Sequence, residues 1–336
     1  MKHAASRGPG PDWPLAVGLA AGVIVDALAG DPARGHPVAL FGRTMTAIEG
    51  SLYADRRLPG AAFAAGGVAL AVGPVLGADQ LTRHLARGLP RHSGGRRPAL
   101  GATAGLVLTA MTTWAVTGAR SLAAEAGRIR RALARGDLSG ARRMLPALCG
   151  RDPAHLDSAG VARAVVESVA ENSCDAIVAP LLWGALAGPA GLAGYRAVNT
   201  LDAMAGHRSQ RYARFGWASA RLDDVANWAP SRVTALLAAA CAPVAGGRPA
   251  TTWRNVQRYG SRHPSPNAGW CEAAFAGALG VRLGGPLSYD GQAEHRPELG
   301  DGRPPEPADI TRAVRLSQAI TAAATALAAL LALADS

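Results

Sequence analysis

The sequence predicts an all-α, polytopic integral membrane protein in which polar helical and loop segments form the active site. Hydrophobic residues make up 49% of its 336 residues, and aromatic residues only 5%. Long uncharged runs recur along the chain, and its few acidic residues cluster between those runs. Four or more such runs in one chain are unusual for the buried core helices of a soluble protein, so we interpret them as membrane segments.

We expect a single membrane-embedded domain over residues 1–336. Its apolar helices are predicted near 13–30, 60–78, 98–119, 176–194, 233–247 and 316–334. Most approach the roughly 20 residues that a spanning helix needs. The run at 233–247 is short, and 176–194 contains Pro180 and Pro189. A re-entrant path is therefore the alternative to a full crossing at 176–194.

Other segments carry weaker signals. Residues 27–29 resemble a signal-peptidase site, but Asp26 directly before them favours a retained first helix. The patterns at 118–135 and 160–174 predict a helical hairpin. Residues 286–309 are rich in proline, glycine and charge and are typical of irregular chain.

The charge balance narrows the function classes. The formal net charge is +11, yet the only lysine is Lys2, so the body of the chain offers none for a P-loop or a Schiff base. Arginines are interspersed with acids and form no patch with interleaved aromatics, so we expect no nucleic-acid partner. Membrane lipid and anionic substrates are the expected partners. The four cysteines show no C-x-x-C spacing and are typical of apolar fillers.

The first acidic cluster lies in "AVVESVAENSCDAIVAPLLW", residues 164–183. In a helix, Glu167, Glu171 and Asp175 share one face, and Asn172 lies beside them. A solvated face would explain this pattern, and so would a Mg²⁺ site, because Mg²⁺ binds through one or two carboxylates plus substrate phosphates. The spacing alone leaves both interpretations open.

Further clusters follow between the apolar runs. Asn199 and Asp202 interrupt an apolar stretch, and an arginine row follows at Arg208, Arg211 and Arg214, which suits anions or a basic strip on lipid. A third cluster consists of Arg221, Asp223, Asp224, Asn227 and Arg232. Its D-D-x-x-N run suits metal and phosphate, and the alternative is a helix N-terminus, whose dipole favours acids.

The remaining candidates lie near the two ends of the chain and in its middle. Asp31 and His36 follow the first apolar run, and Arg151 lies in a G-R-D tripeptide. Around Ser265 and Asn267, the sequence "HPSPN" predicts a turn that N-caps a helix starting near Gly269. This helix would carry Glu272 in its first turn and end at Gly284-Gly285-Pro286.

Six motifs occur in a fixed order along the chain, and together they are specific enough to indicate a family. They are "GDP…HPV…GR" at 30–43, "GRD" at 150–152, "VVESVAENSCDAIVAPL" at 165–181, "YRAVNTLDAMAGH" at 195–207, "RYARFGWASARLDDVANWAPSR" at 211–232 and "SPNAGWCEAAFAGALGVRLGGP" at 265–286. In this order they resemble the CobD/CbiB family of cobalamin biosynthesis, over most of the chain. Two positions depart from the family pattern. Ala203 stands where serine is common, and Gly35 where proline is common.

The resemblance implies an amide-forming ligase of the bacterial cytoplasmic (inner) membrane. Its reaction joins (R)-1-aminopropan-2-ol, or its O-phosphate, to the ring D propionate of adenosylcobyric acid. The implied cofactors are ATP and Mg²⁺, and the implied partners are the corrinoid and the amino alcohol. Other cobalamin-assembly enzymes are candidate partners, and the oligomeric state stays open.

We expect a carboxylate activated as an acyl phosphate and a carboxylate base that takes the proton of the amine. The candidate catalytic residues are Glu167, Glu171, Asp175, Asp202, Asp223 and Asp224. Among these, the candidate metal ligands are Glu171, Asp175, Asp223 and Asp224. The candidate substrate contacts are Asp31, His36, Arg151, Asn172, Asn199, Arg221, Asn227, Arg232, Ser265, Asn267 and Glu272.

Two other function classes remain open. One is a Mg²⁺-dependent membrane transferase acting on an isoprenoid or CDP-alcohol substrate, which the D-D-x-x-N run supports. The other is a non-enzymatic corrinoid transporter or scaffold, which intramembrane charges would also allow.

Overall fold

The computed structural model describes residues 12–32, 35–88, 96–150, 152–207, 209–289 and 292–334. They divide into two compact units. Unit 1 consists of Met1–Thr117, Pro180–Asp223 and Thr325–Ser336, and unit 2 of Gly118–Ala179 and Asp224–Ala324. This division does not test the expectation of one membrane-embedded domain, which stays a prediction.

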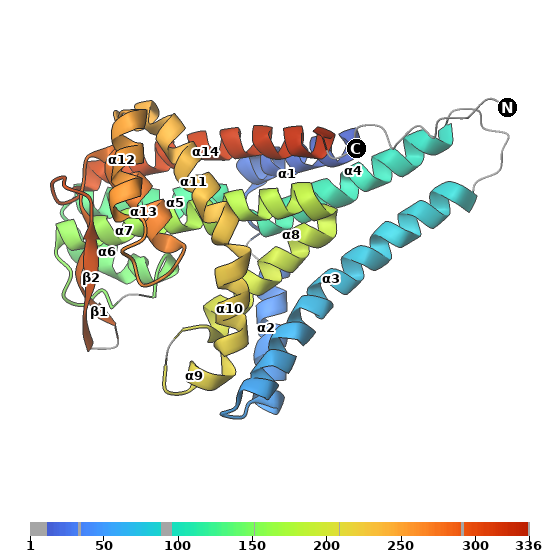
Figure 1. The fold of residues 1–336 in the computed structure, drawn as a ribbon, viewed down its shortest axis with the longest axis horizontal. Helices are drawn as coiled ribbons and strands as arrows, with labels where there is room; N and C mark the ends of the chain where they lie inside the picture. Colours follow the sequence, from blue (N-terminus) through green and yellow to red (C-terminus); the bar gives the residue numbers. More distant parts are fainter. Residues whose placement is uncertain are drawn as a thin grey trace. The chain divides into compact units, whose positions relative to one another are not determined.

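Helices account for nearly all the secondary structure of the described residues, which confirms the predicted class (Figure 1). Helices that begin in unit 1 are α1 (Trp13–Ala29), α2 (Pro37–Leu52), α3 (Arg57–Gly88), α4 (Arg96–Val116), α9 (Tyr212–Phe215) and α10 (Trp217–Ala226). Those that begin in unit 2 are α5 (Ala119–Ala134), α6 (Leu138–Met144), α7 (Ser158–Ser173), α8 (Ala179–Ala205), α11 (Trp228–Cys241), α12 (Pro249–Tyr259), α13 (Ala268–Leu279) and α14 (Pro307–Ala334).

Four helical stretches of the described chain are long and apolar enough to cross a membrane. They are Arg57–Thr82, Gly101–Ala134, Ser158–Ala205 and Pro307–Ala334. The helix α1 is apolar but shorter. Each predicted apolar run therefore lies in helical chain, and the run at 233–247 lies in α11 and the short 3₁₀ turn Ala242–Ala245 after it.

The apolar run at 176–194 is interrupted twice. A π turn, Cys174–Val178, joins α7 to α8. Within α8, Ala187 and Gly188 leave helical geometry, with φ of +61° at Gly188, just before Pro189. A proline that cannot donate a backbone hydrogen bond, after a residue with positive φ, explains the break. Whether this segment crosses the membrane or returns stays a prediction.

In unit 1, α1 crosses α4 at very short range. Gly18 and Gly22 lie one turn apart and face Thr109 and Thr113 of α4. A methyl group added at Gly22 would lie 2.4 Å from Thr113 Cβ and 2.6 Å from the Ala110 carbonyl oxygen. Small residues allow this approach, and close backbone packing is what associates helices in lipid, where the hydrophobic effect contributes little.

The substitution Gly22→Ala should therefore destabilise the protein, by about 1–3 kcal/mol as for other overpacked cores. The control is Gly73→Ala in α3, where an added methyl group meets nothing within 4 Å. Thermal unfolding of purified protein in detergent measures both. Equal melting temperatures for the two variants would contradict the tight α1–α4 contact.

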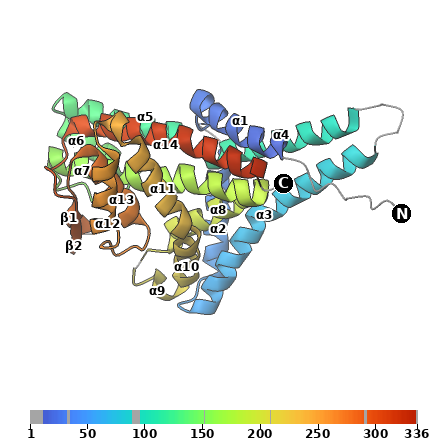
Figure 2. The same ribbon diagram turned by 45° about the horizontal axis from the view of Figure 1, so that its top comes forward.

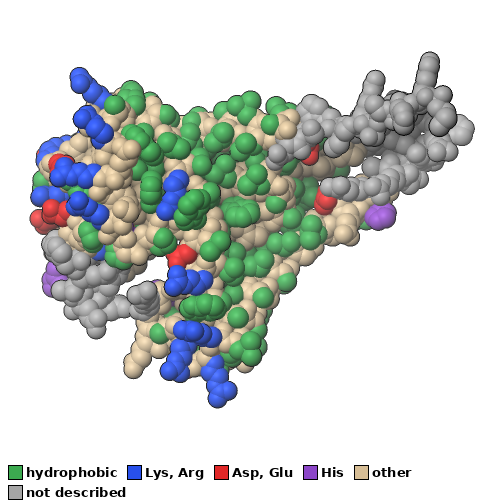
Figure 3. Space-filling view, in the orientation of Figure 1, with side chains coloured by type: hydrophobic (Ala, Val, Ile, Leu, Met, Phe, Trp, Pro, Cys, Tyr) green, Lys and Arg blue, Asp and Glu red, His purple; other side chains and the backbone are tan. Residues whose placement is uncertain are grey.

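The other end of unit 1 has an aromatic core. Met45, Phe63, Leu201 and Phe215 are buried together there, from α2, α3, α8 and α9. Figure 3 shows hydrophobic side chains along α3 and arginines at the end where α3 begins and α9 lies. Apolar side chains that stay exposed on a helix of this length are suited to a lipid-facing surface.

Unit 2 gathers α7, α11, α12 and a β-hairpin around α13. The helix α13 contacts α7, α11 and α12, and both strands of the hairpin (Figures 1 and 2). The strands are β1 (Leu283–Tyr289) and β2 (Gln292–Leu299), which pair antiparallel with Gly285 opposite Arg296. The hairpin brings Arg296 to the side of α13 that carries the acidic centre described below.

The structure confirms some sequence-based boundaries and corrects others. The predicted helical hairpin corresponds to α5 and α7. The expectation of irregular chain over 286–309 is wrong, because β1 and β2 cover much of it. The helix α13 begins at Ala268 but ends before Gly280, which has φ of +68°, and not at Gly284–Pro286. Backbone pairing between segments on either side of a turn stabilises strands that proline and glycine disfavour locally.

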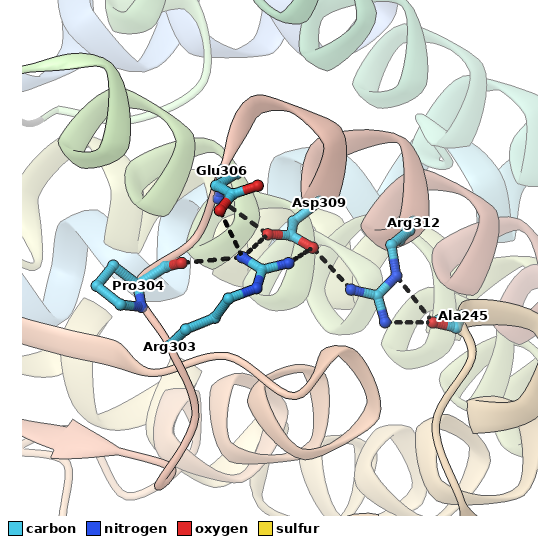
Figure 4. A network of polar contacts seen from close by, with 6 residues as sticks. All are labelled: Ala245, Arg303, Pro304, Glu306, Asp309 and Arg312. Atoms are coloured by element: carbon cyan, nitrogen blue, oxygen red, sulfur yellow. Dashed lines mark hydrogen bonds and ion pairs between the residues drawn. The ribbon is translucent and has the colours of Figure 1, made fainter.

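A charged network fixes the start of α14 (Figure 4). The Asp309 side chain is fully buried, and Arg303 donates to both of its oxygens, at 2.7 and 3.1 Å. Arg312 donates to Asp309 Oδ1 and also to the Ala245 carbonyl oxygen, at 2.6 Å from Nη2. Two arginines and the Glu306 backbone N–H therefore compensate one buried carboxylate and tie α14 to the end of α11.

The substitution Asp309→Asn should cost about 1–3 kcal/mol of stability, because it removes the charge that Arg303 and Arg312 bind and turns a buried amide N–H toward their donors. The matched control is Glu306→Gln, whose side chain is 65% exposed. Thermal unfolding of both variants tests this. If Asp309→Asn melts with the control, the network does not stabilise unit 2.

Candidate active site

The helix α7 positions two of the predicted catalytic carboxylates. It begins where the Asp157 side chain accepts a hydrogen bond from the Gly160 N–H at 2.7 Å, as an N-cap. Glu167 and Glu171 then lie one turn apart on the same face. The π turn begins at Cys174, so Asp175 lies where the face shifts, and π turns occur frequently at functional sites.

Glu167 is engaged by the backbone of the hairpin. Its Oε1 accepts a hydrogen bond from the Gly284 N–H at 2.7 Å, and the side chain is buried. Arg163, one turn earlier on α7, donates to the Gly284 carbonyl oxygen at 2.7 Å. Gly284 has φ of +78°, and an added methyl group would lie 2.2 Å from the Pro297 carbonyl oxygen. Glu167 therefore holds β1 against α7.

Glu171 belongs to a second, tighter group. One donor atom each from Glu171, His263 and Glu272 lie within 4.8 Å of one another. Glu272 comes from α13 and is 1% exposed, whereas Glu171 on α7 is partly exposed. His263, in the loop between α12 and α13, places Nε2 3.7 Å from Glu272 Oε1. We call these three residues the acidic centre.

The electrostatics of the acidic centre are dominated by burial. Burial raises the pKa of the Glu272 carboxyl well above its usual range, and the negative charges of Glu167 and Glu171 raise it further. Burial, followed by the Arg296 guanidinium, lowers the pKa of His263 to about 4. The histidine is therefore neutral at neutral pH.

Asn267 links three segments beside this centre. Its Oδ1 accepts hydrogen bonds from Arg232 Nη1 at 2.8 Å and from Ser231 Oγ at 3.3 Å. Its Nδ2 donates to the Asp224 carbonyl oxygen at 2.8 Å. The predicted turn does precede α13, with Asn267 at the N-cap position, but the side chain of Asn267 makes no cap hydrogen bond. Ser265 Oγ accepts from the N–H groups of Asn267 and Ala268.

The guanidinium of Arg232 lies over two indole rings. Its guanidinium carbon lies 4.9 Å from the Trp228 ring centroid and 4.6 Å from that of Trp270. All its hydrogen bonds to the described residues come from Nη1, to Trp228 O, Ser231 Oγ and Asn267 Oδ1. The edge formed by Nε and Nη2 is thus oriented but unused by the described chain, and such an edge binds carboxylate or phosphate bidentately.

Several other predicted residues lie in unit 1. His36 accepts from the Val38 N–H at Nδ1 and N-caps α2, and its Nε2 lies 3.5 Å from Asp31. Asn199 donates to Asp223 at 3.4 Å. Asp202 is partly buried on α8. In the arginine row of this unit, Arg211 pairs with Glu49 at 3.0 Å and Arg214 with Asp55 at 3.7 Å, while Arg208 lies outside the described residues.

The remaining candidates are dispersed. Asn172 donates to the Ser168 carbonyl oxygen at 2.9 Å. Asn227 is buried and accepts from Cys174 Sγ at 3.7 Å. Arg221 is exposed on α10, and Arg151 lies outside the described residues.

The acidic pair 223–224 lies in the last turn of α10, so the alternative that it begins a helix is wrong. Asp223 belongs to unit 1, and Asp224 belongs to unit 2. Whether both acids serve one site stays a prediction.

Sequence reasoning missed His263 and Arg296. The first directly precedes the Pro264–Asn267 turn, so its place beside Glu272 could have been inferred from that motif. Arg296 carries no local signal, because only strand pairing and the packing of the hairpin on α13 bring it within 3.2 Å of His263 Nε2.

The sequence matches a known protein family. The profile of a family described as "CobD/Cbib protein" matches residues 19–317, which include the acidic centre and Arg232. This chain belongs to the CobD/CbiB family. The resemblance seen in the motifs is thereby confirmed.

The matches to members of the CobD/CbiB family span nearly the whole chain. A protein named "Cobalamin biosynthesis protein CobD" from Mycobacterium tuberculosis is 51% identical over 94% of this chain and 95% of its own length. Proteins of the same name from Geobacter metallireducens and Chromobacterium violaceum are 43% and 41% identical, over 86% and 88% of this chain and 87% and 89% of their own lengths. No solved structure matches the chain.

The substitution Asn267→Asp tests the hydrogen bonds by which Asn267 links segments beside the acidic centre. It retains an oxygen toward Arg232 but turns an acceptor toward the Asp224 carbonyl oxygen, where a donor is required. We expect a loss of about 1–3 kcal/mol, the cost of an unsatisfied buried polar group. Thermal unfolding measures it, with Asn267→Ser as the smaller variant that introduces no repulsion. A melting temperature for Asn267→Asp at or above that of wild type would contradict the assignment.

Proposed function

We propose that this protein is the amide-forming ligase of adenosylcobalamin biosynthesis in the bacterial cytoplasmic membrane. It would join (R)-1-aminopropan-2-ol, or its O-phosphate, to the ring D propionate of adenosylcobyric acid. Membership of the CobD/CbiB family carries this proposal, because curated relatives at 41–51% identity are named cobalamin biosynthesis proteins. The four apolar helical stretches support a multi-pass membrane location.

The geometry of unit 2 supplies groups that such a reaction requires. An anionic substrate needs a fixed cationic edge, and Arg232, which lies over the rings of Trp228 and Trp270, presents one. The attacking ammonium must lose a proton, and a carboxylate within hydrogen-bond reach can accept it. Burial raises the pKa of Glu272, which favours proton uptake by this carboxyl group. Glu171 lies beside it and is partly exposed to an incoming substrate.

ATP would supply the phosphoryl group that activates the carboxylate, and Mg²⁺ would neutralise charge on the phosphate oxygens. Glu171, Asp175, Asp223 and Asp224 are the proposed Mg²⁺ ligands from the sequence. Of these, Glu171 is brought beside a further buried carboxylate, Glu272. Glu167 is committed to the Gly284 N–H, and we assign it the role of positioning β1.

The test is amide formation by purified protein in nanodiscs. Adenosylcobyric acid, ATP and Mg²⁺ are supplied with either amino alcohol, and mass spectrometry follows the corrinoid product. We expect the amide, with ADP and phosphate released in equal amounts. Corrinoid that stays unmodified, or that crosses vesicles unchanged, would overturn the ligase in favour of a transporter. Turnover of an isoprenoid or CDP-alcohol substrate instead would favour the transferase.

Replacing Asp175 or Asp223 by alanine should abolish amide formation while leaving a folded membrane protein. Arg232→Gln should lower kcat/KM by about 10²-fold, as expected for loss of about 3 kcal/mol of charge-assisted binding. The control Arg254→Gln, at an exposed arginine of α12 with only local hydrogen bonds, should retain activity. Near-normal turnover in both aspartate variants would contradict the assignment of those two carboxylates.

A further inference from the structure

Glu272 carries a buried oxygen that the described chain does not satisfy. Its side chain is 1% exposed, and Oε1 has no hydrogen-bond partner among the described residues. The closest oppositely polarised group with a stated distance is His263 Nε2 at 3.7 Å, beyond hydrogen-bond range. A buried carboxylate oxygen without a partner is costly, so it indicates a missing ligand.

The charge around Glu272 favours a positive ligand, because Glu167 and Glu171 act on this carboxyl group and the Arg296 guanidinium offsets them only in part. Glu167, Glu171 and Glu272 bring three carboxylates into one part of unit 2, and Glu167 accepts a hydrogen bond from the Gly284 N–H at 2.7 Å. The side chain of Arg163 is directed at the Gly284 carbonyl oxygen. Glu171 and Glu272 converge from α7 and α13, so a cation between them would relieve the repulsion of both.

His263 does not complete a nitrogen-containing metal site. The Ser265 N–H donates to Nδ1 at 3.0 Å, and Arg296 Nη1 lies 3.2 Å from Nε2. A neutral imidazole has one N–H and one lone pair. If Nδ1 accepts, Nε2 carries the hydrogen; if Nε2 accepts, its lone pair is directed at Arg296. In either tautomer Nε2 offers no lone pair to a cation.

We propose that Glu171 and Glu272 bind a hard divalent cation, Mg²⁺ or Mn²⁺, through oxygen ligands alone, with His263 adjacent but not coordinated. Two carboxylates plus water or substrate phosphate are the ligands such ions take, whereas zinc prefers nitrogen and sulfur. The partly exposed Glu171 gives the cation its route to Glu272. This inference rests on the proposed function for its catalytic meaning, but its test does not.

The probe is Mn²⁺ added to the purified, metal-free protein without corrinoid or ATP. Electron paramagnetic resonance counts free Mn²⁺, and electron spin echo measurements detect nitrogen bound to it. We expect one saturable site without nitrogen coordination. Glu171→Gln and Glu272→Gln should each weaken binding more than about tenfold, because each removes a charged ligand.

Two controls separate coordination from folding. Glu306→Gln removes an exposed carboxylate of the same unit and should bind Mn²⁺ as wild type does. His263→Gln should change the affinity less than about threefold, since no metal bond is lost. Without metal, Glu272→Gln should melt no lower than wild type, because it removes the repulsion between Glu272 and the neighbouring carboxylates.

The inference is overturned if wild type binds no Mn²⁺ at millimolar concentration, or if both glutamine variants bind as wild type does. Nitrogen coupling that disappears in His263→Gln would also overturn it. If Mn²⁺ binding behaves as expected but no amide forms, the cation site stands and the proposed function fails. If the amide forms while Mn²⁺ binding ignores both variants, the reverse holds.

Discussion

The burial of carboxylates constrains the organisation of unit 2, because each one requires its own compensation. Asp309 is compensated by two arginines and a backbone N–H, and this fixes the start of α14. Glu167 is compensated by the Gly284 N–H, and this fixes β1 on α7. Glu272 is left with an oxygen that the described chain does not satisfy. The two compensated acids hold neighbouring segments in place, and the third is the one for which we propose a cation.

The same requirement explains why the hairpin matters. A strand pair in a mostly helical protein could be a mere connection between α13 and α14. Here β1 supplies the N–H that satisfies Glu167, and β2 supplies Arg296 beside His263. The hairpin therefore adds, through Arg296, to the lowering of the His263 pKa that burial causes first.

Unit 1 follows a different physical rule. Its α1 and α4 meet through Gly18 and Gly22 against threonines, so van der Waals contact between backbones replaces a core of large side chains. An alanine- and glycine-rich sequence with few aromatics suits such packing. The cost is that single methyl groups matter where two helices touch and are inconsequential on the open face of α3.

The sequence by itself determined the helical class, the apolar segments and, through long motifs, the family. These features depend on composition and on residues that are neighbours in the chain, so local periodicity reveals them. It also placed Glu171, Glu272, Asn267 and Arg232 among the candidates for the site.

Only the tertiary structure decided which contacts each of those residues makes. Glu167 and Glu171 are equivalent by spacing, yet Glu167 meets a backbone N–H from a hairpin 117 positions away, and Glu171 meets Glu272. The hairpin itself was missed because its strands form by pairing across a turn, against local propensity. Which carboxylate meets a backbone donor, and which meets a second carboxylate, depends on segments brought together by folding, so no local pattern contains it.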